Sequence, residues 1–306
     1  MPGAGPLGRT DFPKLFASRL PYIDKLIGPD SWKEIDNQWM QYFNIRNSDR
    51  MREDFLEYAG FGLFRSIGEH EKVTYDQMIQ GPSKSVLHTL YGLGFEIGYL
   101  VGKHDIDGIV AKNAPELGRS MRVSLQTLAA ALWNGSFSTT LTADGQYLCD
   151  TDHTYIRGSG TWANAPLVAT ALGHAALESA IVTFSRLKDP MQNPMTIQPQ
   201  NLLIPPELAP MAHELLQSQL RHDTTTHAES YVHGKLTPHV WPFLTSSTAW
   251  WVLAPQNQLQ IYWYWSVKPE TSHGLDFDTG AGKTKTLFAC STVAVDPRGV
   301  YGTAGA

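Results

Sequence analysis

The sequence has little charge for its size. Asp, Glu, Lys and Arg make up 17% of the 306 residues, against about 25% in typical soluble domains. A soluble chain with few charges must cover part of its surface by other means. Protein interfaces are depleted in Lys and Glu and enriched in aromatic residues, and this chain has 9 Trp, 12 Tyr and 12 Phe. The composition therefore favours a subunit of an extensive oligomer.

Cysteine, basic segments and long apolar runs are also scarce. Two cysteines, Cys149 and Cys290, cannot form the disulfide framework of a secreted domain in a chain of this length. The N-terminus lacks a signal-peptide core, and the longest apolar region, 165–184, is interrupted by His174 and Glu178. The net charge is −5 with no strongly basic half, which excludes nucleic-acid binding by bulk charge. We expect a soluble protein of a reducing compartment, with no membrane partner.

The first hundred residues contain segments that cannot fold alone. Residues 1–30 are rich in Gly and Pro without a clear period and predict an extended arm. From Leu87 to Val101 large side chains occupy every second position and glycines occupy several positions between them, which is typical of a long strand with one bare face. Phe61–Ile67 repeats the alternation more weakly across a polar segment. Residues 50–103 therefore predict a projecting hairpin that needs a neighbouring subunit to lie on, because isolated hairpins are marginally stable.

The rest of the chain predicts a mixed α+β fold. Apolar residues three or four apart predict a long helix over 105–133, which Pro115 would divide and Asn134-Gly135 would end. Two further helices and five strands are predicted from the same kinds of pattern. The helices are 172–188 and 205–217, and the strands are 196–197, 202–204, 249–253, 259–267 and 283–295.

Three clusters contain the residue types of active sites. Gly280–Thr284 is similar to a phosphate-binding loop, but Phe277 stands where that motif needs its first glycine. Cys149, Asp152 and His153 could suggest a thiol nucleophile, but catalytic Cys and His are usually distant in sequence, so we interpret them as a polar turn. Histidines between 222 and 239 have the residue type of metal ligands without a recognised spacing, so we interpret them as solvated loop residues. No cofactor is expected.

Four stretches, in this order, resemble the major head subunit of Mu-like phages, a branch of the tailed-phage capsid proteins. They are Phe137–His153, Asn201–Leu208, Leu244–Leu253 and Asp296–Tyr301. The resemblance covers roughly residues 105–301 and implies the Hong Kong 97-type capsid fold. It further implies an N-terminal arm (1–30), an extended loop (50–103), a peripheral domain with a spine helix (31–49, 104–160 and 271–306) and an axial domain (161–270).

The resemblance also implies a function. Many copies would assemble, as pentamers and hexamers, into an icosahedral head that encloses double-stranded DNA through weak, non-specific contact. Assembly would occur in the host cytoplasm with a scaffolding protein, a portal and a decoration protein. The expected inter-subunit residues are Arg9, Lys14 and Arg19 in the arm, and Phe61, Phe64, Glu69, Lys72, Lys84, Tyr91 and Phe95 in the loop. His222, His227 and His233 would lie in an axial pore loop.

Two alternatives remain open from the sequence. The first keeps the fold and changes the content, as in encapsulin nanocompartments, which enclose enzymes in place of DNA. The second is a different class, a metal-dependent hydrolase that uses the histidines of residues 222–239. The first predicts protein inside the particle, and the second predicts stoichiometric metal.

Overall fold

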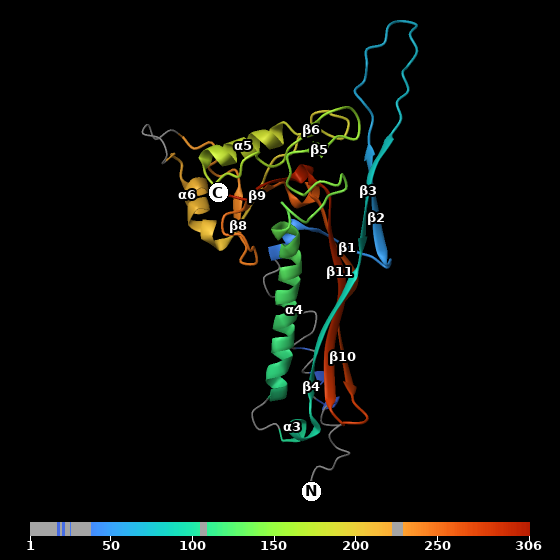
Figure 1. Cartoon of the computed structure of the whole chain (residues 1–306), viewed down its shortest axis with the longest axis vertical. Helices are drawn as coiled ribbons and strands as arrows, with labels where there is room; N and C mark the ends of the chain where they lie inside the picture. The colour runs from blue at the N-terminus through green and yellow to red at the C-terminus, as the bar shows by residue number, and fades with distance from the viewer. Residues whose placement is uncertain (1–16, 19, 22–24, 26–37, 105–108, 222–228) are drawn as a thin grey trace.

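A long sheet and a long helix run side by side along most of the molecule (Figure 1). The computed structural model describes residues 17, 18, 20, 21, 25, 38–104, 109–221 and 229–306. The four-stranded long sheet has the order β1-β10-β11-β4, antiparallel except where β1 meets β10. Its strands are β1 (Asn44–Asn47), β4 (Thr89–Ile97), β10 (Gln260–Leu275) and β11 (Gly282–Asp296). Helix α4 (Ile109–Asn134) lies along β4 and β11.

A second, smaller sheet lies beside one end of the long sheet (Figure 1). Its order is β12-β9-β7-β8, and helices α5 (His174–Ser185) and α6 (Ala209–Gln217) pack around it. The strands are β7 (Asn201–Ile204), β8 (Thr237–Val240), β9 (Trp250–Leu253) and β12 (Val300–Thr303). Because β12 follows β11 after the short helix η4 (Pro297–Gly299), the chain crosses from the long sheet to the small sheet at this turn.

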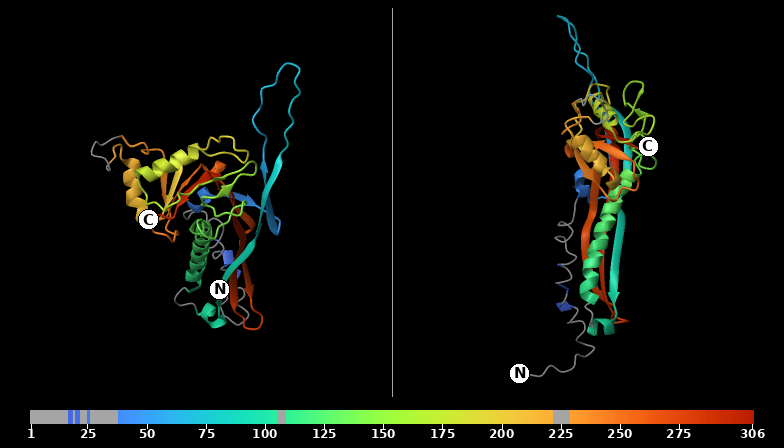
Figure 2. Two further views of the ribbon diagram at one scale, coloured as in Figure 1. Left: turned by 45° about the horizontal axis from the view of Figure 1, so that its top comes forward. Right: turned by 90° about the vertical axis from the view of Figure 1, so that its left-hand side faces the viewer.

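Strands β2 (Arg52–Ala59) and β3 (Ile79–Leu87) form a hairpin that projects beyond the rest of the molecule (Figures 1 and 2). They pair with each other, from Arg52 opposite Leu87 to Ala59 opposite Ile79, and form a separate two-stranded sheet. Residues 60–78, here called the tip, extend past the ladder without regular structure. The side view in Figure 2 shows a thin molecule from which the tip emerges at one end.

Several small elements lie between these. They are η1 (Gln38–Tyr42), α3 (Tyr99–Lys103), the short pair β5 (His153–Thr154) with β6 (Thr161–Trp162), η2 (Pro206–Leu208) and η3 (Gln256–Gln258). Within the part of the chain that the structure describes, no helix combines the length and apolar character needed to cross a bilayer.

Aromatic side chains fill the core where the two sheets meet. Trp39 of η1 packs on Trp263 of β10 with ring centroids 4.3 Å apart, and Trp133 of α4 packs on Trp251 of β9 at 6.2 Å. Some of the indole N–H groups find acceptors there, such as the Ser136 hydroxyl for Trp251 at 3.0 Å. The buried tryptophans are Trp39, Trp133, Trp241, Trp250, Trp251, Trp263 and Trp265. These seven tryptophans therefore belong to the core of the subunit. They are not available for the subunit interfaces that we expected from the aromatic composition.

The structure corrects several expected elements. The run from Leu87 to Val101 is not one strand of a projecting hairpin, because β4 pairs with β11 and the chain turns into α3 after Ile97. Pro115 does not divide α4, which continues through it. No strand forms at 196–197. The expected boundary at residue 270 falls inside β10, which pairs with β11 over its whole length.

The bare face of β4 allows β11 to approach closely. A Cβ atom at Gly94 would lie 2.5 Å from the Thr284 carbonyl oxygen, and one at Gly92 would lie 2.3 Å from Leu287 Cδ2. The Leu287 side chain can rotate away, whereas a backbone carbonyl within a ladder cannot. The glycines that the sequence showed as a bare face therefore serve packing within the subunit.

We predict that Gly94→Ala destabilises the subunit by about 1–3 kcal/mol, because the added methyl overpacks against fixed backbone. Gly274→Ala is the matched control, since Gly274 lies in the same sheet with nothing within 4 Å of its Cβ position. Urea unfolding followed by tryptophan fluorescence measures both variants. Equal stability of the two variants would contradict the close approach.

Candidate functional site

The tip exposes a concentration of apolar side chains that the rest of the subunit does not cover. Phe64 is 105% exposed and Tyr75 is 92% exposed. The other large exposed apolar residues of the tip and the adjoining end of β2 are Tyr58, Phe61, Leu63, Ile67, Val73 and Met78. Contiguous exposed apolar surface of this kind marks an interaction site. The hairpin is therefore the candidate functional site.

Four of the seven predicted loop residues lie on the tip and three do not. Phe61, Phe64, Glu69 and Lys72 are all exposed there. Lys84 lies in the hairpin but not on the tip, because it is in the β3 ladder opposite Phe55, where it is half-buried.

Tyr91 and Phe95 belong to the long sheet and not to the hairpin. Tyr91 stacks on Phe288 of β11 with centroids 5.4 Å apart. Phe95 packs against a small cluster that contains Ile97 and Leu117. Both were expected in the projecting loop because β4 follows the hairpin directly in sequence.

An apolar contact joins the hairpin to the body. Phe55 of β2 lies against two tyrosines of β10, stacked on Tyr262 at 5.6 Å and edge-on to Tyr264 at 5.7 Å. On β3, a Cβ atom at Gly81 would lie 2.4 Å from Ile156 Cδ1, so the strand passes close to the turn after β5. Apolar contacts of this type hold surfaces together without defining one angle between them.

A buried guanidinium lies where the hairpin leaves the body. Arg298 has a side chain only 5% exposed, and its Nη1 donates to Asp296 Oδ2 at 2.7 Å and to Glu57 Oε1 at 3.1 Å. Its Nε donates to the Lys188 carbonyl at 2.9 Å. We call Glu57, Lys188, Asp296 and Arg298 the junction. It links β2, the chain after α5 and the end of β11.

The pKa values of Glu57 and Arg298 in the junction are both raised, for different reasons. Burial raises the pKa of Glu57, and repulsion from Asp296 adds to this effect, while attraction to Arg298 opposes it. Burial disfavours the charge of Arg298, but the carboxylates of Asp296 and Glu57 outweigh burial and raise the pKa of Arg298. Arg298 is therefore a permanent cation with two carboxylates as direct partners.

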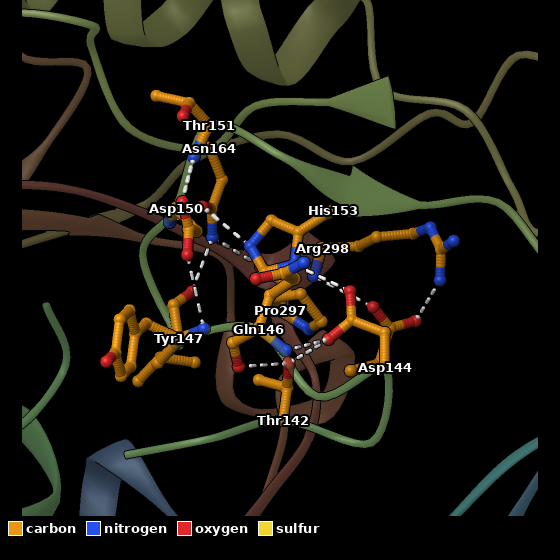
Figure 3. Close-up of polar contacts among 12 residues, drawn as sticks. Thr142, Asp144, Gln146, Tyr147, Asp150, Thr151, His153, Asn164, Pro297 and Arg298 are labelled. Atoms are coloured by element: carbon orange, nitrogen blue, oxygen red, sulfur yellow. Dashed lines mark hydrogen bonds and ion pairs between the residues drawn. The ribbon is translucent and has the colours of Figure 1, made fainter. Parts of the chain in front are cut away.

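His153 extends this polar cluster (Figure 3). The ring is fully buried, with Nδ1 2.8 Å from Asp144 Oδ2 and Nε2 3.1 Å from Asn164 Oδ1. The amide orientation of Asn164 is defined because its Nδ2 donates to the Leu148 carbonyl at 2.7 Å and its Oδ1 accepts from the Asp150 N–H at 2.9 Å. Both ring nitrogens of His153 therefore lie within hydrogen-bond distance of a side-chain oxygen.

Trp162 connects His153 to the junction. The His153 ring stacks on the Trp162 indole at 4.7 Å, and the Arg298 guanidinium lies 5.2 Å from the same indole. Cations are attracted to the faces of aromatic rings. His153, Trp162 and Arg298 thus form one connected unit between the small β5–β6 pair and η4.

Asp144 is the anion that balances His153. Burial by itself would raise the pKa of Asp144, but hydrogen bonds from His153 and Thr142 and the charge of His153 lower it to about 2. The side chain is 9% exposed. Asp144 therefore stays ionised over the whole physiological range.

Sequence reasoning missed Glu57, Asp144 and Arg298 as site residues. Glu57 and Arg298 are 241 residues apart, and no local pattern links them. One signal was present, because Arg298 lies in the Asp-Pro-Arg-Gly turn that contributed to the family resemblance. The polar-turn interpretation of His153 was closer than the thiol alternative, because burial raises the pKa of Cys149 well above its usual range.

The other candidate residues are partly outside the described chain. Arg9, Lys14, Arg19, His222 and His227 lie outside the described residues. His233 is exposed, and its Nδ1 lies 3.1 Å from the Leu216 carbonyl.

The structure adds no support for a phosphate site at Gly280–Thr284 or for a metal site among the described histidines. Gly280–Thr284 forms the end of the β10–β11 turn, where Lys283 pairs with Asp276 at 2.5 Å. Among the residues described, no group of three His, Cys, Asp or Glu side chains is placed to hold a metal ion.

Comparison with known proteins adds a family and a fold. A family profile described as "Phage capsid protein" matches residues 85–303. The procapsid of bacteriophage JBD30 has a similar subunit, with a TM-score of 0.54, 13% identity, and coverage of 95% of this chain and 75% of that chain. No curated protein matches the sequence.

Two further solved structures agree in fold. The capsid of cyanophage P-SCSP1u gives a TM-score of 0.60 at 10% identity and covers 86% of each chain. A virus-like particle from Pyrococcus furiosus gives 0.53 at 10% identity, with 92% of this chain and 99% of that chain covered. These likenesses confirm the expected α+β Hong Kong 97-type fold.

We predict that Asp144→Asn destabilises the subunit by about 2 kcal/mol at pH 7, the value of a carboxyl pKa that folding lowers from 3.8 to about 2. Because the folded-state pKa is the lower one, this stability is present above pH 4 and is lost as the pH falls towards 2. The wild type should therefore approach the variant only in acid. Unfolding curves at pH 7, 4 and 2.5 measure this, and a constant difference would contradict the ion pair.

Proposed function

The chain belongs to the phage capsid protein family, and from this premise we propose that its copies interlock through the hairpin to form an icosahedral head that encloses double-stranded DNA. Its role as a major capsid protein that forms the head shell follows from the family. The observation that supports interlocking is the tip, whose exposed apolar side chains lie on a segment with no ladder of its own. Such a segment is stabilised only when a neighbour covers it.

Assembly through such projections does not need strong single contacts. Each subunit would engage several neighbours, so that contacts of modest affinity combine through multivalency. Closed symmetry then covers the exposed surfaces of every copy. We propose no catalytic activity for the chain, in keeping with a structural family.

The division into domains is part of this proposal. We retain an arm at residues 1–30, an axial domain and a peripheral domain, and we revise three assignments. Because β10 and β11 form one continuous ladder, residues 260–270 are assigned to the peripheral domain with the rest of β10. Because β12 pairs with β9, residues 300–303 are assigned to the axial domain. The extended loop narrows to residues 52–87.

The arrangement of the subunits and the other proteins of the head are also part of the proposal. We propose pentamers and hexamers around the axial domains, with His222, His227 and His233 near the pore and Arg9, Lys14 and Arg19 on a neighbouring subunit. A scaffolding protein, a portal and a decoration protein would act with the chain in the host cytoplasm, within the Mu-like branch. DNA contact would be weak and non-specific, since the net charge of −5 gives the chain no bulk attraction for phosphate.

A protein-filled compartment is the second candidate. The similar fold of a virus-like particle from Pyrococcus furiosus, which is not named as a phage head, is the observation for keeping it, since that likeness covers nearly all of both chains. The two candidates differ in what the particle contains.

Negative-stain electron microscopy and sedimentation of the recombinant protein, alone and with its neighbouring genes, test the proposal. Closed polyhedral shells or capsomer rings are expected. Particles isolated from the natural source should contain DNA, and a protein cargo would favour the compartment. A small monodisperse species in both preparations would reject shell assembly.

We predict that replacing residues 60–78 by Asn-Gly abolishes shell assembly and leaves the subunit folded. Ala59 and Ile79 are paired, so a two-residue turn can close the ladder directly. Assembly should fail because the exposed apolar surface of the tip is removed. Sedimentation and the melting temperature measure the two properties separately. The matched control is Glu71→Gln, which alters tip charge but no apolar side chain and should still assemble. Normal shells from the shortened hairpin would show that the tip is dispensable.

A further inference from the structure

Besides the close approach of Gly81 to Ile156, three side-chain contacts between the hairpin and the body can define the direction of the hairpin. They are the packing of Phe55 on Tyr262 and Tyr264, the pair of Arg157 with Asp76, and the contact of Arg298 with Glu57. β2 and β3 pair only with each other among the described strands, and the one continuous strand connection to the long sheet is β3, which continues through His88 into β4. A single strand connection can pivot, so the direction in which the tip leaves the body depends also on side-chain contacts.

The three contacts differ in how well each defines the angle between the hairpin and the body of the subunit. Aromatic pairs prefer stacked or edge-to-face arrangements, but these are met over ring-centroid separations of about 4.5–7 Å, so this packing defines the angle loosely. Arg157 and Asp76 meet at 2.9 Å, but their side chains are 44% and 32% exposed, and exposed ion pairs contribute little. Arg298 and Glu57 are 5% and 16% exposed, so their hydrogen bond is shielded from water and demands a defined geometry.

Arg298 is itself held from several sides. Its Nε donates to the Lys188 carbonyl, its Nη1 also binds Asp296, and its guanidinium lies over Trp162. Its backbone N–H donates to Asp296 Oδ1 at 3.0 Å. These contacts hold the guanidinium in one orientation without any contribution from Glu57. Glu57 itself lies two residues from the end of β2 that leads to the tip.

We propose that Arg298 is the positioning residue of the hairpin, and that its hydrogen bond to Glu57 sets the direction in which the tip reaches a neighbouring subunit. The assembly consequence rests on the proposed function, whereas the positioning itself is a property of the isolated subunit. A tip held at one angle meets its neighbour's surface without first losing orientational freedom, and preorganisation of this kind strengthens binding.

Distances between two spin labels test the positioning in the dissociated, full-length subunit. Lys72→Cys places a label on the tip and Val123→Cys places one on the exposed side of α4. The native cysteines, Cys149 and Cys290, are both buried, and burial raises the pKa of Cys290 to about 12, so neither competes for label under native conditions. Double electron–electron resonance then gives the distribution of tip positions.

The decisive variant is Glu57→Ala, which removes the hairpin's half of the contact and leaves Arg298 paired with Asp296. The distribution should broaden about twofold, because only packing that defines the angle loosely and an exposed ion pair remain. Glu53→Ala is the matched control. Glu53 is the same residue type on the same face of β2, but its carboxylate accepts from the nearby Ser48 hydroxyl. Glu57→Gln retains an acceptor oxygen and should restore the narrow distribution.

Two results would overturn the proposal. A narrow distribution in Glu57→Ala would assign the direction to the Phe55 packing. Broadening in Asp76→Ala but not in Glu57→Ala would assign it to Arg157. Failure of the wild-type chain to form shells would reject the proposed function and leave the spin-label result standing, so the two failures are distinguishable. If both hold, Glu57→Ala should also form fewer closed shells than Glu53→Ala at equal protein concentration.

Discussion

A guanidinium removed from water requires anionic or carbonyl partners, and this requirement determines how the parts of the subunit meet at Arg298. Its partners come from β2, from the end of β11 and from the chain that follows α5. Removing one partner of a buried ion pair is strongly destabilising, by about 3–5 kcal/mol. The three segments are therefore constrained to one arrangement around Arg298. His153 and Asp144 extend the same constraint towards the β5–β6 pair, through the stack on Trp162.

Two kinds of apolar surface have separate roles in this chain. Tryptophan fills the interior where the sheets, η1 and α4 meet, and its indole N–H groups are used in part to define that packing. Phenylalanine, tyrosine and aliphatic residues are exposed on the tip. The first surface makes a subunit that can fold alone, and the second is left for a neighbour. The low charge content of the chain fits both roles, since a smaller fraction of its surface stays in water after assembly.

Local patterns in the sequence predicted the elements well and their pairing less well. Periodicity identified α4, α5 and β11 nearly to their ends, because burial of one face repeats along each element. The pairing of β4 with β11 joins residues almost 200 positions apart, and alternation alone cannot distinguish a strand in a projecting hairpin from a strand in a central sheet. Tyr91 and Phe95 were misplaced for this reason. Pro115 was misjudged because packing of α4 along the long sheet outweighs one missing hydrogen bond.

In the candidate site, too, local sequence patterns did not predict contacts between distant residues. Exposed aromatic residues of the tip could be found from sequence because the hairpin itself was visible there. The Glu57–Arg298 contact could not, since it depends on how two distant turns fold against one another. Family resemblance supplied the fold and the shell function, and the physical chemistry of the structure supplied the residues that orient the hairpin.

The central claim is that exposed apolar side chains of the tip are covered by a neighbouring copy in the shell. A cryo-electron microscopy reconstruction of the assembled particle measures this directly. The account predicts that Phe64 and Tyr75 are buried against another subunit in every copy, with the bond from Arg298 to Glu57 intact. Tips that extend into solvent in a closed, stable shell would contradict it.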